Sequence, residues 1–255
     1  MKKTTIILAA FMVLAIVFSV TGCRVVDRGE TVTRTYDYTG FTEIQIGNAF
    51  ELEILPSDEY SIAVTASEGL FERLQVSKSG SRLKIDITGW FFSFRGMKVV
   101  ITMPEVEGLY LSGATRTDAK GFSSKRDLTI ELSGASSLDM DIEAGNTDIE
   151  VSGASRIKGG LTAEDSRFHV SGASDVDLQG SGNDIRLEVS GASTMDLLEF
   201  PVQDADVELS GASTARLDVS GRLDAELNGA STLRYEGSPL LGSIDSSGGS
   251  SFGPH

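Results

Sequence analysis

The sequence predicts an all-β solenoid, a β-helix with about 19 residues per turn. The word Ser-Gly-Ala-Ser, or a close variant, recurs eight times in the second half of the chain, with successive glycines 18 to 21 residues apart. Apolar residues fill 28 of the 32 positions that lie one and three places before each copy, or two and four places after it. The residues between these positions are nearly all polar, and this period of two is typical of β-strands with one buried face. The copies begin at Ser112, Ser133, Ser152, Ser171, Ser190, Ser210, Asn228 and Ser247.

The first residues predict export and a lipid anchor. Lys2 and Lys3 precede an uncharged, largely apolar run over residues 6–20, which predicts a signal peptide over residues 1–22. The Val-Thr-Gly-Cys word at this junction resembles a bacterial lipobox, in which cleavage leaves the cysteine, here Cys23, as a lipidated first residue. An ordinary signal peptide with a chance cysteine is the alternative. Because Cys23 is the only cysteine, an intramolecular disulfide is impossible.

The rest of the chain is acidic. The only charged residues before position 23 are two lysines, so residues 23–255 carry 20 Lys and Arg against 37 Asp and Glu, a net charge of −17. Such a surface repels nucleic acid and anionic lipid alike, so we expect no nucleic-acid partner and expect membrane contact through the acyl chains. The predicted location is the cell envelope, on the outer face of the membrane. In a two-membrane cell it is the outer membrane, because Arg24 rather than Asp follows the cysteine.

Three segments follow the predicted signal peptide. Residues 23–36 are interpreted as a tether, and residues 37–255 as one continuous domain. Residues 37–105 are β-rich but lack the repeated word, which indicates irregular first turns or a capping meander, and residues 106–255 form the repeat β-helix. Each regular turn is expected to run strand, corner, strand, loop and short third strand, and glycine pairs such as Gly159-Gly160 are assigned to the loop. Glycine suits the corner because it tolerates backbone angles that side chains forbid.

Two further motifs resemble those of a known family. GFxxIxIGNAFxLxI opens the domain at residues 40–54, and VxIxMPxVxxLxLSGA leads into the repeats at residues 99–114. Together with the Ser-Gly-Ala-Ser series they resemble the head GIN domain family, described as putative auto-transporter adhesins, over about residues 38–255. The resemblance implies a right-handed β-helix on a bacterial surface, and it supplies no catalytic or ligand-binding residues. A translocator barrel and a heptad stalk are missing from the sequence, so we expect lipid anchoring in place of self-transport.

Two surface features are candidate binding sites. A column of outward carboxylates is expected just before the repeated word, and its stacked charges repel one another unless a divalent cation or a basic partner neutralises them. A solvated acidic face is the alternative, and no calcium-loop motif is present. An aromatic segment is expected either to contact a glycan or partner or to plug the open end of the solenoid. The column consists of Glu131, Glu150, Glu188, Glu208 and Glu226, and the aromatic residues are Trp90, Phe91, Phe92 and Phe94.

The predicted function is non-catalytic binding or adhesion, with a glycan or another envelope protein as the ligand and no cofactor. Every copy of the repeated word forms the same corner, and none has the distinct base beside its serine that nucleophilic catalysis requires. Lys158 with Asp139 and Asp177 on neighbouring turns comes nearest to a catalytic constellation, which leaves a carbohydrate-active β-helix enzyme as a weaker alternative. An envelope structural or stress-related protein without a small-molecule ligand is the other alternative.

Overall fold

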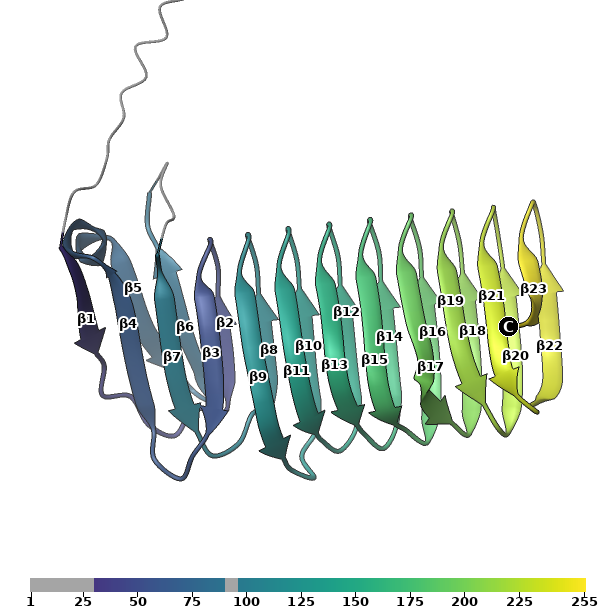
Figure 1. Ribbon diagram of the computed structural model, residues 1–255, viewed down its shortest axis with the longest axis horizontal. Coiled ribbons are helices and arrows are strands. Elements are labelled where there is room, and N and C mark those ends of the chain that lie inside the picture. Colours follow the sequence, from purple (N-terminus) through teal and green to yellow (C-terminus); the bar gives the residue numbers. More distant parts are fainter. Residues whose placement is uncertain (1–29, 90–95) are drawn as a thin grey trace, which may run out of the picture.

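The computed structural model describes residues 30–89 and 96–255, which form an elongated rod of two facing β-sheets (Figure 1). These residues contain 23 strands and one short 3-10 helix, η1 (Glu68–Glu72). The described part of the chain has no helix that is long and apolar enough to cross a membrane. The prediction of an all-β solenoid is confirmed. Its handedness stays a prediction from the family resemblance.

Strand order in both sheets follows the axis of the rod. In spatial order, the twelve-stranded sheet contains β1 (Thr31–Thr35), β4 (Ser61–Ser67), β7 (Lys98–Met103), β3 (Glu51–Pro56), β9 (Arg116–Ser123), β11 (Ser137–Glu143), β13 (Arg156–Thr162), β15 (Asp175–Ser181), β17 (Thr194–Val202), β19 (Thr214–Val219), β21 (Thr232–Gly237) and β23 (Ser251–Pro254). The eleven-stranded sheet contains β22 (Leu240–Ser246), β20 (Arg222–Leu227), β18 (Asp204–Leu209), β16 (Asp184–Val189), β14 (Ser166–Val170), β12 (Thr147–Val151), β10 (Leu128–Leu132), β8 (Gly108–Leu111), β2 (Glu43–Ile46), β6 (Arg82–Ile87) and β5 (Leu74–Ser79).

Each regular turn contributes one strand to each sheet. For example, β12 crosses the eleven-stranded sheet, the chain turns at residues 152–155, and β13 returns through the twelve-stranded sheet. β12 pairs in parallel with β10 and β14, so that Ile149 lies between Ile130 and Phe168. All three side chains are fully buried between the sheets. The apolar positions of the sequence pattern therefore stack into continuous columns that form the core.

The expected third strand is not a separate element in the described turns. The strand after the corner is long instead, reaching nine residues in β17. A glycine bends such a strand on the way: Gly159 in β13 has a φ of 118°, and a Cβ at this position would lie 2.0 Å from the carbonyl oxygen of Met140. The Gly159-Gly160 pair, which the sequence analysis assigned to a loop, is therefore the bend of one continuous strand.

The repeated word forms the corner where the chain passes from one sheet to the other. Gly153 has a φ of 78°, and the amide of Ala154 donates a hydrogen bond to the carbonyl oxygen of Gly134 on the preceding turn at 2.8 Å. In several copies the fourth residue is a serine whose hydroxyl donates to the carbonyl oxygen of the first residue of the same corner. The corners thus form a hydrogen-bonded ladder along the rod. It begins at Asn48, the single non-glycine residue with positive φ among those described.

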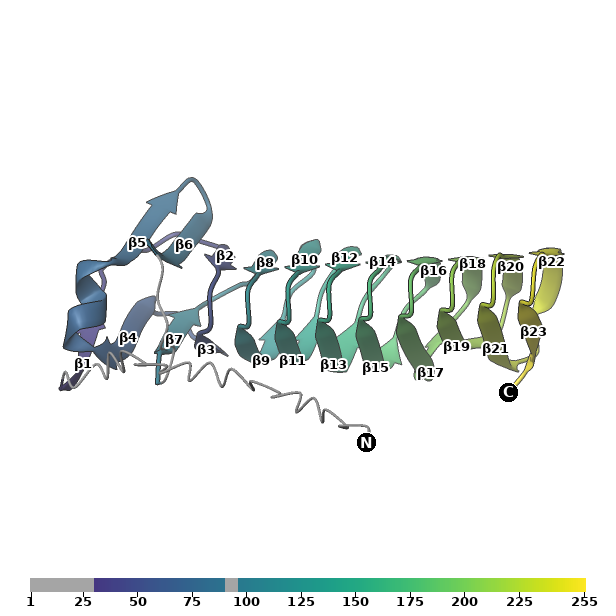
Figure 2. The same ribbon diagram turned by 90° about the horizontal axis from the view of Figure 1, so that it is seen from above.

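The end of the rod nearest the N-terminus departs from the parallel pattern. β1 pairs antiparallel with β4, and β5 pairs antiparallel with β6. Helix η1 covers this end with Leu70 and Phe71 buried, and Figure 2 shows β5 and β6 tilted away from the rod axis. The expectation of irregular first turns is confirmed. The predicted tether over residues 23–36 is too long, because β1 already belongs to the sheet and Val32 packs against the core.

Candidate functional site

The predicted acidic column lies on the outer face of the eleven-stranded sheet. Parallel pairing places each member beside the equivalent residue of the next turn, from Glu131 on β10 to Glu226 on β20. His169 on β14 occupies one position in this row. The side chains therefore form the row that the sequence pattern indicated, and its electrostatics depend on what neutralises it.

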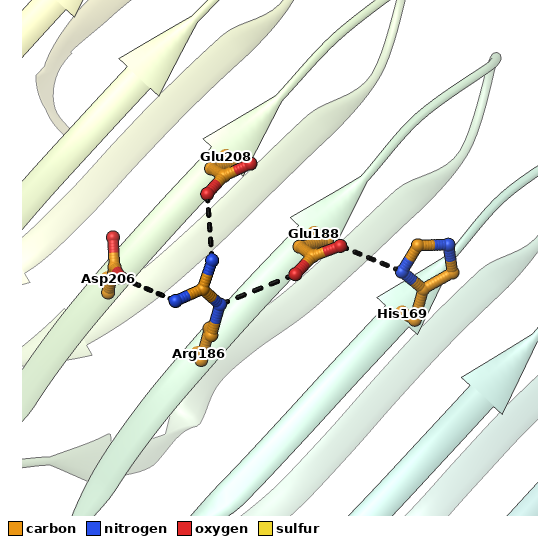
Figure 3. Close-up of polar contacts among 5 residues, drawn as sticks. All are labelled: His169, Arg186, Glu188, Asp206 and Glu208. Carbon is orange, nitrogen blue, oxygen red and sulfur yellow. Dashed lines mark hydrogen bonds and ion pairs between the residues drawn. The ribbon is translucent and has the colours of Figure 1, made fainter.

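A single arginine pairs with two glutamates of the column and one neighbouring aspartate (Figure 3). Arg186 donates from Nη2 to Oε1 of Glu208 at 2.9 Å and from Nε to Oε1 of Glu188 at 3.3 Å. Its Nη1 lies 3.3 Å from Oδ2 of Asp206, and Nδ1 of His169 lies 3.0 Å from the second carboxylate oxygen of Glu188. Within residues 30–89 and 96–255, no group of three or more His, Cys, Asp or Glu side chains is placed to hold a metal ion. Arg186 supplies positive charge that the sequence analysis expected from a cation or a basic partner.

A groove with a volume of about 630 Å³ lies on the same sheet beside the acidic column. It crosses the six strands β10, β12, β14, β16, β18 and β20, so at about 4.8 Å per strand it extends roughly 24 Å along the rod. Two rows of side chains line it. The loop row comprises Asp127, Asn146, Asp165, Asp184 and Asp204, and the middle row comprises Thr129, Asp148, Arg167, Arg186, Asp206 and Asp224.

Backbone amides of successive turns hold the loop row in place. Oδ1 of Asp127 accepts a hydrogen bond from the amide of Asn146 at 3.0 Å, and the contact repeats at Asn146, Asp165, Asp184 and Asp204. These hydrogen bonds tie each side chain of the row to the backbone of the next turn. The sequence analysis missed this row. Its signal was present, because Asp or Asn stands six places before five consecutive copies of the repeated word.

Three arginines with different surroundings line the groove: Arg167 and Arg186 in the middle row, and Arg222 at the first position of β20. Nη2 of Arg222 lies 2.8 Å from Oδ1 of Asp224, and this arginine, together with the backbone amide of Ser243, lowers the pKa of Asp224 to about 2. Arg186 is engaged by three carboxylates, as described above. Arg167, on the strand next to Arg186, is exposed, and no carboxylate within the described part of the chain lies at ion-pair distance from it. Arg167 is therefore the arginine of the groove that is available to a ligand.

The outer face of the twelve-stranded sheet carries a second hollow, of about 590 Å³, at the predicted catalytic candidates. Nζ of Lys158 lies 2.7 Å from Oδ2 of Asp139, and Nζ of Lys120 lies 2.9 Å from its Oδ1. The hydrogen bonds from Lys158 and Lys120 hold the pKa of Asp139 below its ordinary value. Asp177 faces Lys158 in the register of the sheet. This arrangement keeps Asp139 as a carboxylate between two cations, which suits charge pairing and opposes proton donation.

Two predicted features lie outside the described residues. One is Cys23, the predicted lipidation site, and the other is the aromatic segment with Trp90, Phe91, Phe92 and Phe94. The anchoring and contact roles assigned to them stay predictions from the sequence.

Several solved structures have a similar fold. A putative adhesin from Parabacteroides merdae has a TM-score of 0.80 at 15% identity, covering 89% of this chain and 97% of that one. A putative adhesin from Parabacteroides distasonis has a TM-score of 0.77 at 16% identity, covering 89% and 98%. A putative lipid binding protein, also from Parabacteroides distasonis, has a TM-score of 0.78 at 19% identity, covering 88% and 97%. These likenesses show a shared fold. No curated protein matches the chain.

The family resemblance is borne out by a match over residues 40–239 to the model described as putative auto-transporter adhesin, head GIN domain. The matched stretch begins at the first motif of the domain and extends over 200 of the 255 residues, through most of the repeated corners. The chain belongs to the head GIN domain family.

Proposed function

We propose that this chain is an exported, lipid-anchored binding module of the bacterial envelope that holds an extended glycan in the groove of the eleven-stranded sheet. The groove carries the proposal, because paired strands present its polar side chains in register across six turns, and Arg167 has no carboxylate partner among the described residues. The description of the family as an adhesin head, and of two structural relatives as adhesins, supports a role in binding.

A polyhydroxylated chain fits the chemistry of the groove. Its carboxylates accept hydrogen bonds and its guanidinium groups donate them, and sugar hydroxyls do both. Seven aspartates and three arginines give the groove a net charge of −4, which disfavours a strongly anionic polymer. Because equivalent groups recur on each turn, an extended ligand along the rod meets similar partners repeatedly, and weak contacts add up.

We also propose that binding is not followed by bond cleavage. The side chains of the loop row accept hydrogen bonds from backbone amides. Asp206 and Asp224 form ion pairs with arginines. Among them, Asp224 has its pKa lowered to about 2 by Arg222 and the backbone amide of Ser243. Glycoside hydrolysis needs a carboxylic acid that stays protonated near neutral pH beside a second carboxylate, and environments of this kind oppose that state.

Removing the unpaired arginine of the groove is expected to weaken glycan binding by about tenfold to a hundredfold. The estimate follows from losing a charge-assisted hydrogen bond of roughly 1.5–3 kcal/mol. A glycan array probed with the intact protein would identify the bound glycan, and titration of that glycan would compare wild type with Arg167→Ala. The matched control is Arg116→Ala, which removes an exposed arginine from the other sheet.

The outcomes separate the alternatives. Equal affinity in wild type and Arg167→Ala would remove the groove as the binding site, and a loss confined to Arg116→Ala would move the ligand to the twelve-stranded sheet. If no glycan binds and a protein from envelope extract is retained by wild type and lost by Arg167→Ala, the ligand is a protein. If no glycan binds and no envelope protein is retained, a structural role would be favoured.

Lipid anchoring is tested separately through Cys23. Cells that express the full chain and grow in labelled palmitate are expected to label the wild-type protein and to leave Cys23→Ala unlabelled, because the sulfur of Cys23 would carry the diacylglyceryl group that holds the acyl chains. The membrane fraction should hold the wild type, since each buried methylene contributes about 0.8 kcal/mol to membrane binding. Equal label in both proteins would contradict the lipobox interpretation.

A further inference from the structure

The last turn of the rod, residues 238–255, has an unusual surface. It contains one Asp, Glu, Lys or Arg, namely Asp245, whereas the whole chain has 59 such residues among 255. Leu240 is 70% exposed and Leu241 is 44% exposed, and Leu55 is the other large hydrophobic residue exposed among those described. Few charges together with exposed apolar side chains are typical of the centre of a protein–protein interface.

The same turn contains the open edge of each sheet (Figure 1). On β23 this edge is partly closed. The amides of Ser251 and His255 point inward to carbonyl groups of the preceding turn, so the alternate residue Pro254 lies where an outward amide would be, and proline has none. On β22 the amide of Ser247 points inward, so those of Ile244 and Ser246 point outward. β22 therefore presents backbone donors and acceptors to a further strand.

The opposite end of the rod does not match this surface. Antiparallel β1 and β5 form its edges, η1 covers the core between them, and β5 and β6 tilt away from the axis (Figure 2). Head-to-tail stacking would join two ends of different shape. Joining two last turns brings together identical surfaces, which a two-fold axis closes at two copies.

We propose that two copies of this chain associate through their last turns, with β22 of one copy pairing antiparallel to β22 of the other. The exposed leucines are buried at this contact, and the free edge of β22 gains hydrogen bonds. Charge favours the same geometry. Residues 23–255 carry a net charge of −17, so two rods side by side repel each other, whereas the last turn brings one carboxylate from each copy to the contact.

Sedimentation velocity of the intact protein in a mild detergent, over a wide range of concentration, tests the association. Wild type is expected to show a reversible monomer–dimer equilibrium. The double variant Leu240→Asp, Leu241→Asp should raise the dissociation constant by at least about a hundredfold, because association would bury the new carboxylates without partners in an apolar contact. The matched control is Leu55→Asp, which introduces the same charge at a leucine exposed by 39% on β3 and should leave the equilibrium unchanged.

Hydrogen exchange locates the contact within the dimer. At concentrations where wild type dimerises, the amides of Ile244 and Ser246 should exchange more slowly than at dilution, and the double variant should lose this difference. A wild type that stays monomeric, a double variant that associates as wild type does, or a dimer in which these two amides remain unprotected would each overturn the proposal. Far-UV circular dichroism of every variant confirms that the fold is retained.

Discussion

Gly153→Ala is expected to lower the free energy of unfolding by about 3 kcal/mol or more. Gly153 adopts a φ of 78°, where a side chain costs roughly 1–2 kcal/mol. A Cβ at this position would also lie 2.4 Å from the carbonyl oxygen of Gly134, so the corner must open and weaken the bond that Ala154 donates to that oxygen. Urea unfolding followed by circular dichroism measures the change, and the melting temperature should fall by about 6–12 °C.

The matched control is Gly249→Ala, another corner residue. Gly249 has no positive φ, and its Cβ would lie 3.7 Å from the nearest atom, a carbonyl oxygen, which is ordinary contact. The free energy of unfolding of the Gly249→Ala variant should differ from that of wild type by no more than about 0.5 kcal/mol. If the two alanine variants were equally stable, the corner ladder would not depend on glycine, and the close stacking of successive corners would have to be abandoned as the reason for the repeat.

Phe168→Ala is expected to cost about 3–5 kcal/mol, because it leaves a cavity in the middle of the core. Phe168 is completely buried and stacks between Ile149 and Leu187 of the neighbouring turns. In a solenoid each turn contacts mainly the turns beside it. The substitution therefore weakens the contacts that make the two halves of the rod unfold together. Denaturant unfolding is therefore expected to show a lower midpoint and a broader transition.

His169→Ala provides the comparison at the adjacent residue of the same strand. Its side chain points outward to Glu188, and an exposed contact of this kind contributes little, so the change should stay within about 0.5 kcal/mol. If Phe168→Ala and His169→Ala lowered the free energy of unfolding by similar amounts, the assignment of alternate residues to the core and to the surface would be wrong.

The sequence predicts the fold of this chain well because the pattern is repeated. Alternation places Ile130, Ile149 and Phe168 inside, and parallel register then stacks them without further information. The prediction of loops failed where a glycine lies within a strand, because glycine occurs in both kinds of segment. Gly159 marks a bend within a strand, and nothing in a single glycine distinguishes a bend from a loop. β1 was also missed, since Thr31–Thr35 has a short, mostly exposed pattern that depends on antiparallel pairing with β4.

The surface was harder to predict than the core. The acidic column follows from register, but the ion pairs of Arg186 with Glu188 and Glu208 depend on the side-chain rotamer and on neighbours one turn away. The loop row could have been found by the same reasoning, because Asp127 and its equivalents hold a constant offset from the repeated word. The groove required the structure, since its existence depends on how the side chains of the loop row and the middle row lie across six strands.

The corner ladder also determines how a protein of this kind can change in length. Each corner bonds to the one before and the one after, so inserting or deleting a whole repeat of about 19 residues restores the same contacts on both sides of the change. Such an event alters the reach of the rod by about 4.8 Å and leaves its cross-section as it was. A change of one residue within a strand would instead turn apolar side chains outward. Duplication of whole repeats is therefore the route by which evolution can lengthen this molecule without redesigning it.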